Sequence, residues 1–272
     1  MILNEIITRK RRDLEELKRR FPMHRLRSAV QHLKRSAERP FLKAVSNPKR
    51  LNLICEIKKA SPSEGILRED FQPLRIASLY EHAGAAAISV LTEPFYFKGR
   101  PSYLKTIRQV ASIPLLRKDF IFETYQIYET ALLEADAYLL IASLLTGEEL
   151  KDLIELGREL NMEALVEIHA DEDLKKAVDA GARMIGINNR NLKTLAVDPQ
   201  RARSLLPHIP KGIVKIVESG LTQHDELLVY KSLGADAFLI GTAIMKSPDM
   251  VAAIEKLLGS DRKFRKTEGS SL

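Results

Sequence analysis

The chain has 272 residues, 45% hydrophobic and 29% charged, a composition typical of a soluble globular protein. No apolar stretch approaches the ~18 residues that a membrane-spanning helix requires, and the first residues lack the pattern of a signal peptide. Cys55 is the only cysteine, which excludes an internal disulfide and favours a cytoplasmic location. The length suits one large α/β domain.

The net charge of +7 is concentrated near the N-terminus. Residues 1–50 carry 15 Lys/Arg and 5 Asp/Glu, which leaves 28 Lys/Arg against 31 Asp/Glu in the rest of the chain. A basic segment can bind nucleic acid or an anionic surface, or it can be a solvated helix face that attracts an anionic substrate. No aromatic residues interleave with the basic ones as stacking platforms would require, so we expect no nucleic-acid partner and an anionic substrate instead.

The first part of the chain is predicted to be helical. Residues 2–20 have Ile and Leu on one face and Arg and Glu on the other, and Pro22 follows them. A second helix is predicted over 24–36 and a short third over 40–45, so residues 1–48 form a helical extension. The apolar face of the first helix needs a partner, so we expect it to cover the catalytic end of the next domain, with Arg and Lys near the substrate.

The following residues alternate between short apolar runs and helical patterns. Apolar runs bounded by polar residues are typical of strands buried on both faces, and Gly84, Gly181 and Gly234 stand where helix ends require a left-handed cap. Eight such units predict a single α/β domain, a (βα)8 TIM barrel over 49–260, followed by a polar tail over 261–272. A doubly wound sheet is disfavoured because no glycine-rich nucleotide motif occurs. Strands are expected near 51–58, 86–91, 113–117, 136–141, 162–167, 183–188, 213–218 and 236–240, and helices near 72–83, 101–110, 124–134, 147–160, 172–180, 199–206, 223–233 and 249–258.

Polar and charged side chains recur where the predicted strands end. In a barrel those ends share one mouth, and a charge there is costly to desolvate unless it is used. A lysine beside other cations should have a lowered pKa and a partly buried glutamate a raised one, so both could exchange protons near neutral pH. Satisfied salt bridges would explain Glu93 or Arg190 alone, but not the whole set. The set is Glu56, Lys58, Glu93, Lys118, Glu167, Asn188, Arg190, Glu218 and Ser219.

Two glycine-containing turns follow the last two predicted strands. Ser219-Gly220 and Gly241-Thr242 occupy the positions at which barrels hold phosphate on backbone N–H groups. Ordinary turn chemistry is the alternative interpretation. The two turns together predict a phosphate site.

Loops after the first three predicted strands supply further candidates. Ser61 lies in a Ser-Pro-Ser-Glu-Gly loop that is expected to cover Lys58. Phe97 and Phe120 are expected to wall an apolar slot for a planar ring. The six histidines are scattered and no metal-binding spacing occurs, so we expect no metal.

The motifs at these strand ends match a known family in order and position. They are Glu56-Ile57-Lys58-Lys59-Ala60-Ser61-Pro62-Ser63, Leu91-Thr92-Glu93, Leu116-Arg117-Lys118-Asp119-Phe120, Leu165-Val166-Glu167, Ile187-Asn188-Asn189-Arg190-Asn191-Leu192 and Glu218-Ser219-Gly220. Over about residues 50–245 the chain thereby resembles the indole-3-glycerol phosphate synthase family. The helical extension is similar to that of the family.

The resemblance implies a carboxy-lyase of tryptophan biosynthesis. Its reaction closes the ring of 1-(2-carboxyphenylamino)-1-deoxyribulose 5-phosphate to give indole-3-glycerol phosphate, with loss of CO2 and water. The resemblance implies Lys118 or Lys58 as the general acid, Lys58 as the contact of the benzoate, and Glu167 and Glu56 as the acid–base pair of dehydration. The implied substrate contacts are Ser61, Glu93, Phe97, Phe120, Asn188, Arg190 and Glu218, and the implied phosphate contacts are Ser219, Gly220, Gly241 and Thr242.

The resemblance also implies a monofunctional cytoplasmic enzyme that needs no cofactor. We expect a monomer with no fused partner enzyme, whose partner is a small substrate carrying a carboxylate and a phosphate. One alternative is another phosphosugar barrel, such as an aldolase that forms a Schiff base, or an isomerase. A nucleic-acid-binding protein that uses the basic N-terminus is a second alternative.

Overall fold

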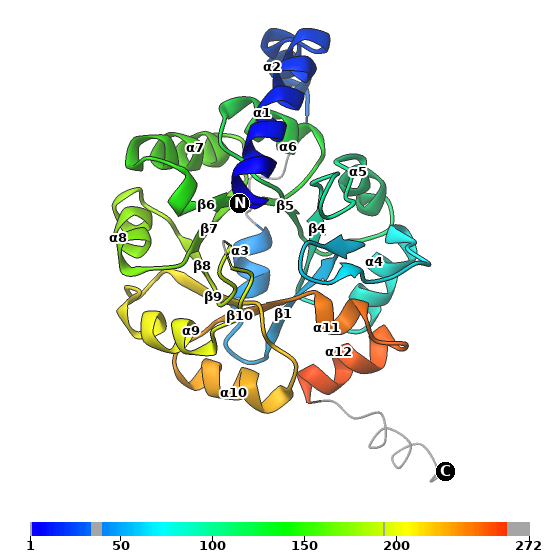
Figure 1. The fold of residues 1–272 in the computed structure, drawn as a ribbon, viewed down its shortest axis with the longest axis vertical. Helices are drawn as coiled ribbons and strands as arrows, with labels where there is room; N and C mark the ends of the chain where they lie inside the picture. Colours follow the sequence, from blue (N-terminus) through cyan, green and yellow to red (C-terminus); the bar gives the residue numbers. More distant parts are fainter. Residues whose placement is uncertain (1, 34–39, 193, 260–272) are drawn as a thin grey trace.

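Eight parallel strands close into a barrel, surrounded by helices (Figure 1). The computed structural model describes residues 2–33, 40–192 and 194–259, so the predicted tail over 261–272 and the predicted barrel end at 260 lie outside the described residues. The order around the barrel is β1-β10-β9-β8-β7-β6-β5-β4, and the predicted (βα)8 barrel is confirmed. The strands are β1 (Asn52–Ile57), β4 (Ala87–Leu91), β5 (Leu115–Lys118), β6 (Ala137–Ile141), β7 (Glu163–Ile168), β8 (Met184–Asn188), β9 (Val214–Glu218) and β10 (Ala237–Ile240).

The barrel strands form because each is a short apolar run, and nearly every strand residue is buried. Leu116, Leu165 and Ile216 belong to one apolar cluster inside the barrel. Gly186 on β8 is required by close approach, because a Cβ there would collide with the Glu218 carboxylate of β9. The missing side chain leaves room for a charged group inside an otherwise apolar barrel.

Helices between the strands lie within a few residues of their predicted bounds. Thr146 caps α7 by accepting a hydrogen bond from the Glu149 N–H, and Asp249 caps α12 in the same way. A short 3-10 helix, Ala142–Leu144, follows β6, and a second one, Leu206–His208, follows α9. The barrel helices are α4 (Pro73–His82), α5 (Ser102–Arg108), α6 (Thr124–Leu132), α7 (Gly147–Glu159), α8 (Asp171–Asp179), α9 (Pro199–Leu205), α10 (His224–Ser232), α11 (Thr242–Met245) and α12 (Met250–Leu258).

Two local features differ from the sequence-based expectation. The second helix, α2 (Met23–Gln31), ends earlier than the predicted residue 36. The loop after β1 contains a small antiparallel hairpin of β2 (Ala60–Ser61) and β3 (Gly65–Ile66). Gly65 has a φ of +65°, a left-handed conformation that lets so short a hairpin turn. The pattern of Ser, Pro and Gly predicted a loop because two-residue strands leave no periodicity to detect.

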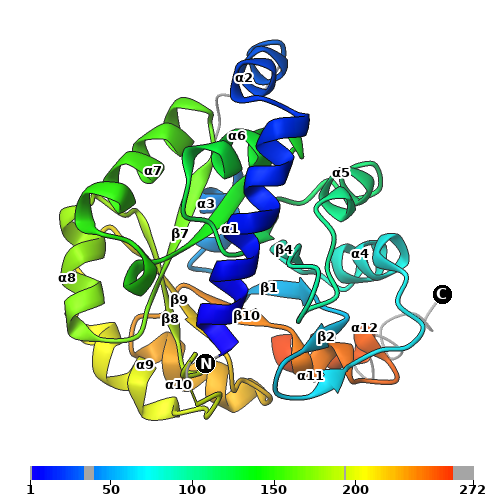
Figure 2. The same cartoon turned by 45° about the horizontal axis from the view of Figure 1, so that its top comes forward.

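The N-terminal helices pack against both ends of the barrel. The first, α1 (Ile2–Arg20), lies across the loops that follow β4 and β5, and α2 packs against α6 (Figure 2). The third, α3 (Pro40–Val45), directly precedes β1 and buries Phe41 and Val45 among residues of the barrel interior. In the described ranges no helix is long and apolar enough to cross a bilayer.

Candidate active site

A cavity of about 420 Å³ opens at the C-terminal ends of the barrel strands. Every candidate residue from the sequence lines it except Glu93. Residues far apart in sequence meet there because parallel strands bring all their carboxyl ends to the same mouth. The lining candidates are Glu56, Lys58, Ser61, Phe97, Lys118, Phe120, Glu167, Asn188, Arg190, Glu218, Ser219, Gly220, Gly241 and Thr242.

Two groups of opposite charges lie inside this cavity. The Lys118 Nζ lies 3.4 Å from the Glu167 Oε2 and also forms an ion pair with Glu218. The Lys58 Nζ lies 2.8 Å from the Glu56 Oε2. All five side chains are largely buried, so each ammonium lies in a medium where its carboxylate partner acts more strongly than in water.

The pKa values of the central group differ from the sequence-based expectation. Burial lowers the pKa of Lys118, but the carboxylates of Glu218, Glu167 and Glu56 outweigh burial and raise it above its ordinary value. The prediction of a lowered lysine pKa is therefore wrong for Lys118, because its nearest neighbours are carboxylates rather than cations. Lys118 remains an ammonium, and hence a proton donor, at neutral pH.

The two carboxylates beside Lys118 shift in opposite directions. Burial raises the pKa of Glu218 to about 7, because the nearby carboxylates add to burial and together exceed the effect of Lys118. At Glu167 burial acts in the same sense, but Lys118, His169 and a hydrogen bond from Asn188 lower the pKa below its ordinary value. Two carboxylates that share one cation cannot both ionise easily, so Glu218 ionises at a higher pH than Glu167.

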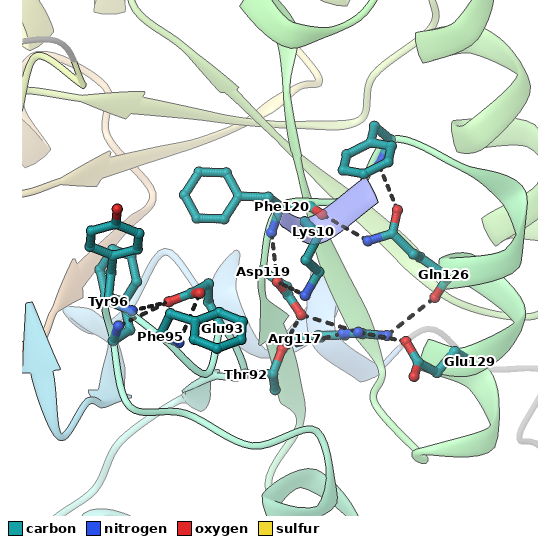
Figure 3. Close-up of polar contacts among 12 residues, drawn as sticks. Lys10, Thr92, Glu93, Phe95, Tyr96, Arg117, Asp119, Phe120, Gln126 and Glu129 are labelled. Carbon is teal, nitrogen blue, oxygen red and sulfur yellow. Dashed lines mark hydrogen bonds and ion pairs between the residues drawn. The ribbon is translucent and has the colours of Figure 1, made fainter. Parts of the chain in front are cut away.

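Glu93 does not line the cavity, and its predicted contact with the substrate stays a prediction. Its carboxylate accepts hydrogen bonds from the backbone N–H groups of Phe95, Tyr96 and Phe97, at 2.8–3.0 Å (Figure 3). Glu93 thus shapes the loop that places Phe97 in the cavity wall. The sequence showed a charge at a strand end, but not that the following loop turns back onto it.

The two predicted phosphate turns line the cavity after β9 and β10, across the barrel from the loops that carry Phe97 and Phe120. Ser219 and Gly220 both have left-handed backbones, with φ of 67° and 77°. Such a conformation is strained for serine, and strain of this kind is concentrated at functional sites. Gly241 packs so closely on Glu56 that a Cβ would collide with its carboxylate. The short helix α11 begins directly after Gly241, at the position where barrels hold phosphate.

The remaining wall of the cavity is apolar. The rings of Phe97 and Phe120 lie 6.4 Å apart between centroids and are tilted by 43°. Such walls suit a planar aromatic group. Aliphatic residues of this wall were not predicted from the sequence, because only their position on strands and loops of the mouth distinguishes them from other apolar residues. They include Leu91, Leu139, Ile141, Leu192, Leu195 and Leu239.

Asp119, also missed, centres a buried charge network next to Lys118 (Figure 3). Its side chain is fully buried and pairs with the Lys10 Nζ at 2.5 Å and with the Arg117 guanidinium at 3.1 Å. The Thr92 hydroxyl donates to it at 2.6 Å. Arg117 is in turn paired with Glu129 at 2.7 Å. The network fixes the backbone on both sides of Lys118 and ties α1 to β5.

The basic residues of α1 contact protein groups rather than the cavity. Besides Lys10, Lys18 pairs with Glu123, and the Arg9 guanidinium lies 3.0 Å from the centroid of the Phe95 ring. No residue of α1 in the described part lines the cavity. Lys10 nevertheless pairs with Asp119, which belongs to the cavity lining, so the expectation that α1 places Arg and Lys near the substrate stays a prediction. These contacts hold the helix on the mouth.

The acid stability of the protein should depend on Asp119. Burial opposes ionisation, but Lys10, Arg117 and Thr92 lower the pKa of Asp119 from 3.8 to about 2. A lowered pKa stabilises the folded state above pH 4, and this contribution is lost as the pH falls toward 2. Asp119→Asn should lower the free energy of unfolding at pH 7 by about 2 kcal/mol, a gap that narrows between pH 4 and 2. Urea unfolding at several pH values measures this difference in free energy of unfolding between the parent and the variant. Asp171→Asn is the control, because Asp171 is exposed. A difference that does not change with pH would contradict the lowered pKa of Asp119.

The Lys10–Asp119 pair should affect substrate binding more than the chemical step. Lys10→Met leaves Asp119 paired with Arg117 and Thr92, so the barrel should stay folded. KM should rise by roughly 5-fold, equivalent to about 1 kcal/mol, with little change in kcat. Lys18→Met is the control, because it removes an α1 ion pair to Glu123, which does not line the cavity. Equal effects of the two variants on KM would show that no single pair positions the helix.

In the parts of the chain that the structure describes, no group of three or more His, Cys, Asp or Glu side chains is placed to hold a metal ion.

Sequence comparison decides the family. A profile described as indole-3-glycerol phosphate synthase matches residues 3–257. The chain belongs to the indole-3-glycerol phosphate synthase family. Proteins of that name from Campylobacter jejuni subsp. doylei and Carboxydothermus hydrogenoformans are 48% and 44% identical to it, over 95% of this chain and 100% of each relative. The resemblance at the strand ends is thus confirmed, and the chain is a carboxy-lyase of tryptophan biosynthesis.

Structural comparison finds the same barrel in more distant proteins. 3-Hexulose-6-phosphate synthase from Salmonella typhimurium superposes with a TM-score of 0.63 at 15% identity, over 77% of this chain and 97% of that one. A mutant tryptophan synthase alpha-subunit from Pyrococcus furiosus gives 0.58 at 18%, over 76% and 98%. At these identities the likeness concerns the fold alone.

Proposed function

We propose that the residues of this cavity carry out the ring closure of 1-(2-carboxyphenylamino)-1-deoxyribulose 5-phosphate. One observation carries the assignment. Lys118 stands between Glu167 and Glu218, with the apolar wall of Phe97 and Phe120 and the glycine turns on different sides of the same cavity. A substrate with an aromatic ring, a ketone and a phosphate matches this order of groups. The anionic small molecule is thus the proposed partner, and a monomeric state and a cytoplasmic location stay predictions.

The first proposed step joins the ring carbon to the ketone. Lys118 donates a proton to the ketone oxygen as the bond forms, and its raised pKa keeps this proton available at neutral pH. Lys58 is the alternative donor. Lys118 is favoured because Lys58 is assigned to the benzoate. The ammonium of Lys58 would hold the benzoate until CO2 leaves.

The second proposed step is dehydration. Glu167, ionised because of Lys118, accepts the proton that leaves carbon. Glu56 receives a proton from the Lys58 ammonium, 2.8 Å away, and passes it to the hydroxyl group, which leaves as water. Asn188 and Arg190 orient the substrate, and Glu218 contacts a hydroxyl. The Arg190 guanidinium donates to the Leu195 carbonyl at 2.7 Å, which supports a defined orientation. Ser61 and Phe97 close the site from the loops after β1 and β4.

The phosphate is assigned to the turns after β9 and β10. Backbone N–H groups near Ser219, Gly220 and Gly241 and the hydroxyl of Thr242 supply donors. The Ser219 hydroxyl adds a further donor. A site built from neutral donors binds phosphate through several hydrogen bonds to a charged acceptor, each stronger than a neutral hydrogen bond.

A turnover assay tests the proposal. The chain contains no Trp, so fluorescence of the indole product rises above a low protein background. Turnover should fall by ~10²-fold or more with Glu167→Gln if this carboxylate transfers a proton. The alternative is an aldolase that forms a Schiff base. Covalent trapping of a ketose phosphate by borohydride, without indole formation, would favour it and refute the ring closure.

A further inference from the structure

The second oxygen of Glu167 faces a histidine outside the cavity. The Glu167 Oε2 contacts Lys118, whereas its Oε1 is buried and has no hydrogen-bond partner among the described residues. The His169 Nε2 lies 3.5 Å from this Oε1, and is likewise buried without a hydrogen-bond partner there. A donor and an acceptor thus face one another, slightly farther apart than a hydrogen bond. Catalytic hydrogen bonds are often long in unliganded enzymes and shorten when substrate binds.

His169 lies between two separate hollows of the surface. Its side chain is 17% exposed, and it does not line the cavity that contains Glu167. It lines a second groove, formed where α8 and α9 begin. Its backbone N–H donates to the Asp173 Oδ2 at 3.0 Å, which fixes the turn that carries the ring. One ring nitrogen therefore reaches the Glu167 carboxylate from a residue that is also accessible from the outside.

The reaction needs a proton from the solvent in every cycle. The substrate enters with an ionised carboxylate, and its carbon leaves as neutral CO2 while a hydroxyl leaves as water. Charge then balances only if one proton is taken up per turnover. Glu167 is 2% exposed, and a bound substrate fills the cavity above it. Glu167 takes a proton from carbon in the proposed dehydration and must lose it before the next turnover. A route through the barrel wall would let this carboxylate lose and take up protons without opening the mouth.

We propose that His169 is a positioning residue that holds the free oxygen of Glu167 and relays protons between this carboxylate and the outer groove. In the relay, the Nε2 proton passes to the Glu167 Oε1 and the other ring nitrogen receives a proton from water, and the reverse transfer discharges Glu167. No bond other than N–H and O–H changes. The inference rests on the proposed role of Glu167.

The surroundings of the ring determine how pH acts on the relay. On the cavity side, Lys118 and Asn188 contact the same carboxylate, and Glu218 lies beyond Lys118. On the groove side both signs of charge occur, with four carboxylates and two guanidiniums. The charged groups there are Asp171, Glu172, Asp173, Asp198, Arg201 and Arg203, with His208 paired to Asp171 at 3.7 Å.

The test compares three histidine variants in the turnover assay. His169→Ala should lower kcat by about 10-fold or more with KM little changed, and imidazole added to the buffer should restore kcat in proportion to its concentration. His169→Gln keeps a hydrogen-bond donor but cannot relay a proton, so it should stay slow and should change the pH profile of kcat. His208→Ala, an exposed histidine of the same region, is the control and should match the parent with and without imidazole.

Each result bears on the relay. Full activity in His169→Gln would show that a donor suffices and would overturn the relay. Unchanged kcat in His169→Ala, or a loss that imidazole does not restore, would overturn it as well. A parent protein that forms no indole product would refute the proposed function, whereas an active parent with an unaffected His169→Ala would refute this inference alone.

Discussion

Lys118→Ala is expected to lower kcat by ~10²-fold or more, the size of effect that a lost general acid has. Lys118 is the ammonium between Glu167 and Glu218, and no other cation contacts both carboxylates among the residues described. KM should change much less, because the phosphate turns and the apolar wall do not depend on this side chain.

The measurement is steady-state turnover followed by indole fluorescence, with Lys175→Ala as a surface control. Lys175 is exposed and pairs only loosely with Asp179, at 3.8 Å, so its loss should leave kcat unchanged. Removal of Lys118 also leaves two buried carboxylates without their cation, so a thermal unfolding scan should accompany the assay. A folded Lys118→Ala variant with the kcat of the parent would remove Lys118 from the mechanism.

The location of the site was predictable because barrel topology requires little beyond strand order. Lys58 and Glu218 lie 160 positions apart in sequence, yet each stands at or just after the C-terminal end of its strand. Closing the strands in a ring brings such residues to one mouth whatever their loops do. For that reason the apolar runs were enough to predict most of the charged residues that share the cavity.

The electrostatics of the site was not predictable from the same pattern. Strand ends show which residues meet, but not which side chains are nearest neighbours. Lys118 therefore was expected beside cations, whereas its actual neighbours are carboxylates that raise its pKa. The contacts of Glu93 were not predictable for a related reason, because the three N–H groups that donate to it belong to a loop whose path the sequence does not reveal.

Contacts between distant elements were also beyond the sequence. The pair of Lys10 and Asp119 joins residues 109 positions apart, and nothing in either segment indicates the other. The apolar face of α1 predicted that the helix packs on the domain, and Ile6 and Leu14 are indeed buried. A hydrophobic stripe defines which face is covered, but the ion pairs decide where the helix comes to lie.

Gly241→Val is expected to have the second largest effect, on binding. The turn after β10 is proposed to hold the phosphate, and a Cβ at this position would also collide with the Glu56 carboxylate. Loss of two hydrogen bonds to a charged phosphate would cost about 3 kcal/mol, so KM should rise by roughly 10²-fold. The barrel should stay folded, because Gly241 follows β10 at the mouth, outside the strand.

Inhibition by inorganic phosphate separates the two consequences of this substitution. Phosphate should compete with substrate in the parent protein and much less in Gly241→Val, whereas displacement of Glu56 alone would lower kcat and leave phosphate inhibition intact. Gly147→Ala is the control, because a Cβ there meets only the Lys176 side chain at 4.0 Å. If phosphate inhibits Gly241→Val as strongly as the parent, the phosphate binds elsewhere in the cavity, and the basic Lys246 in its lining becomes the next residue to test.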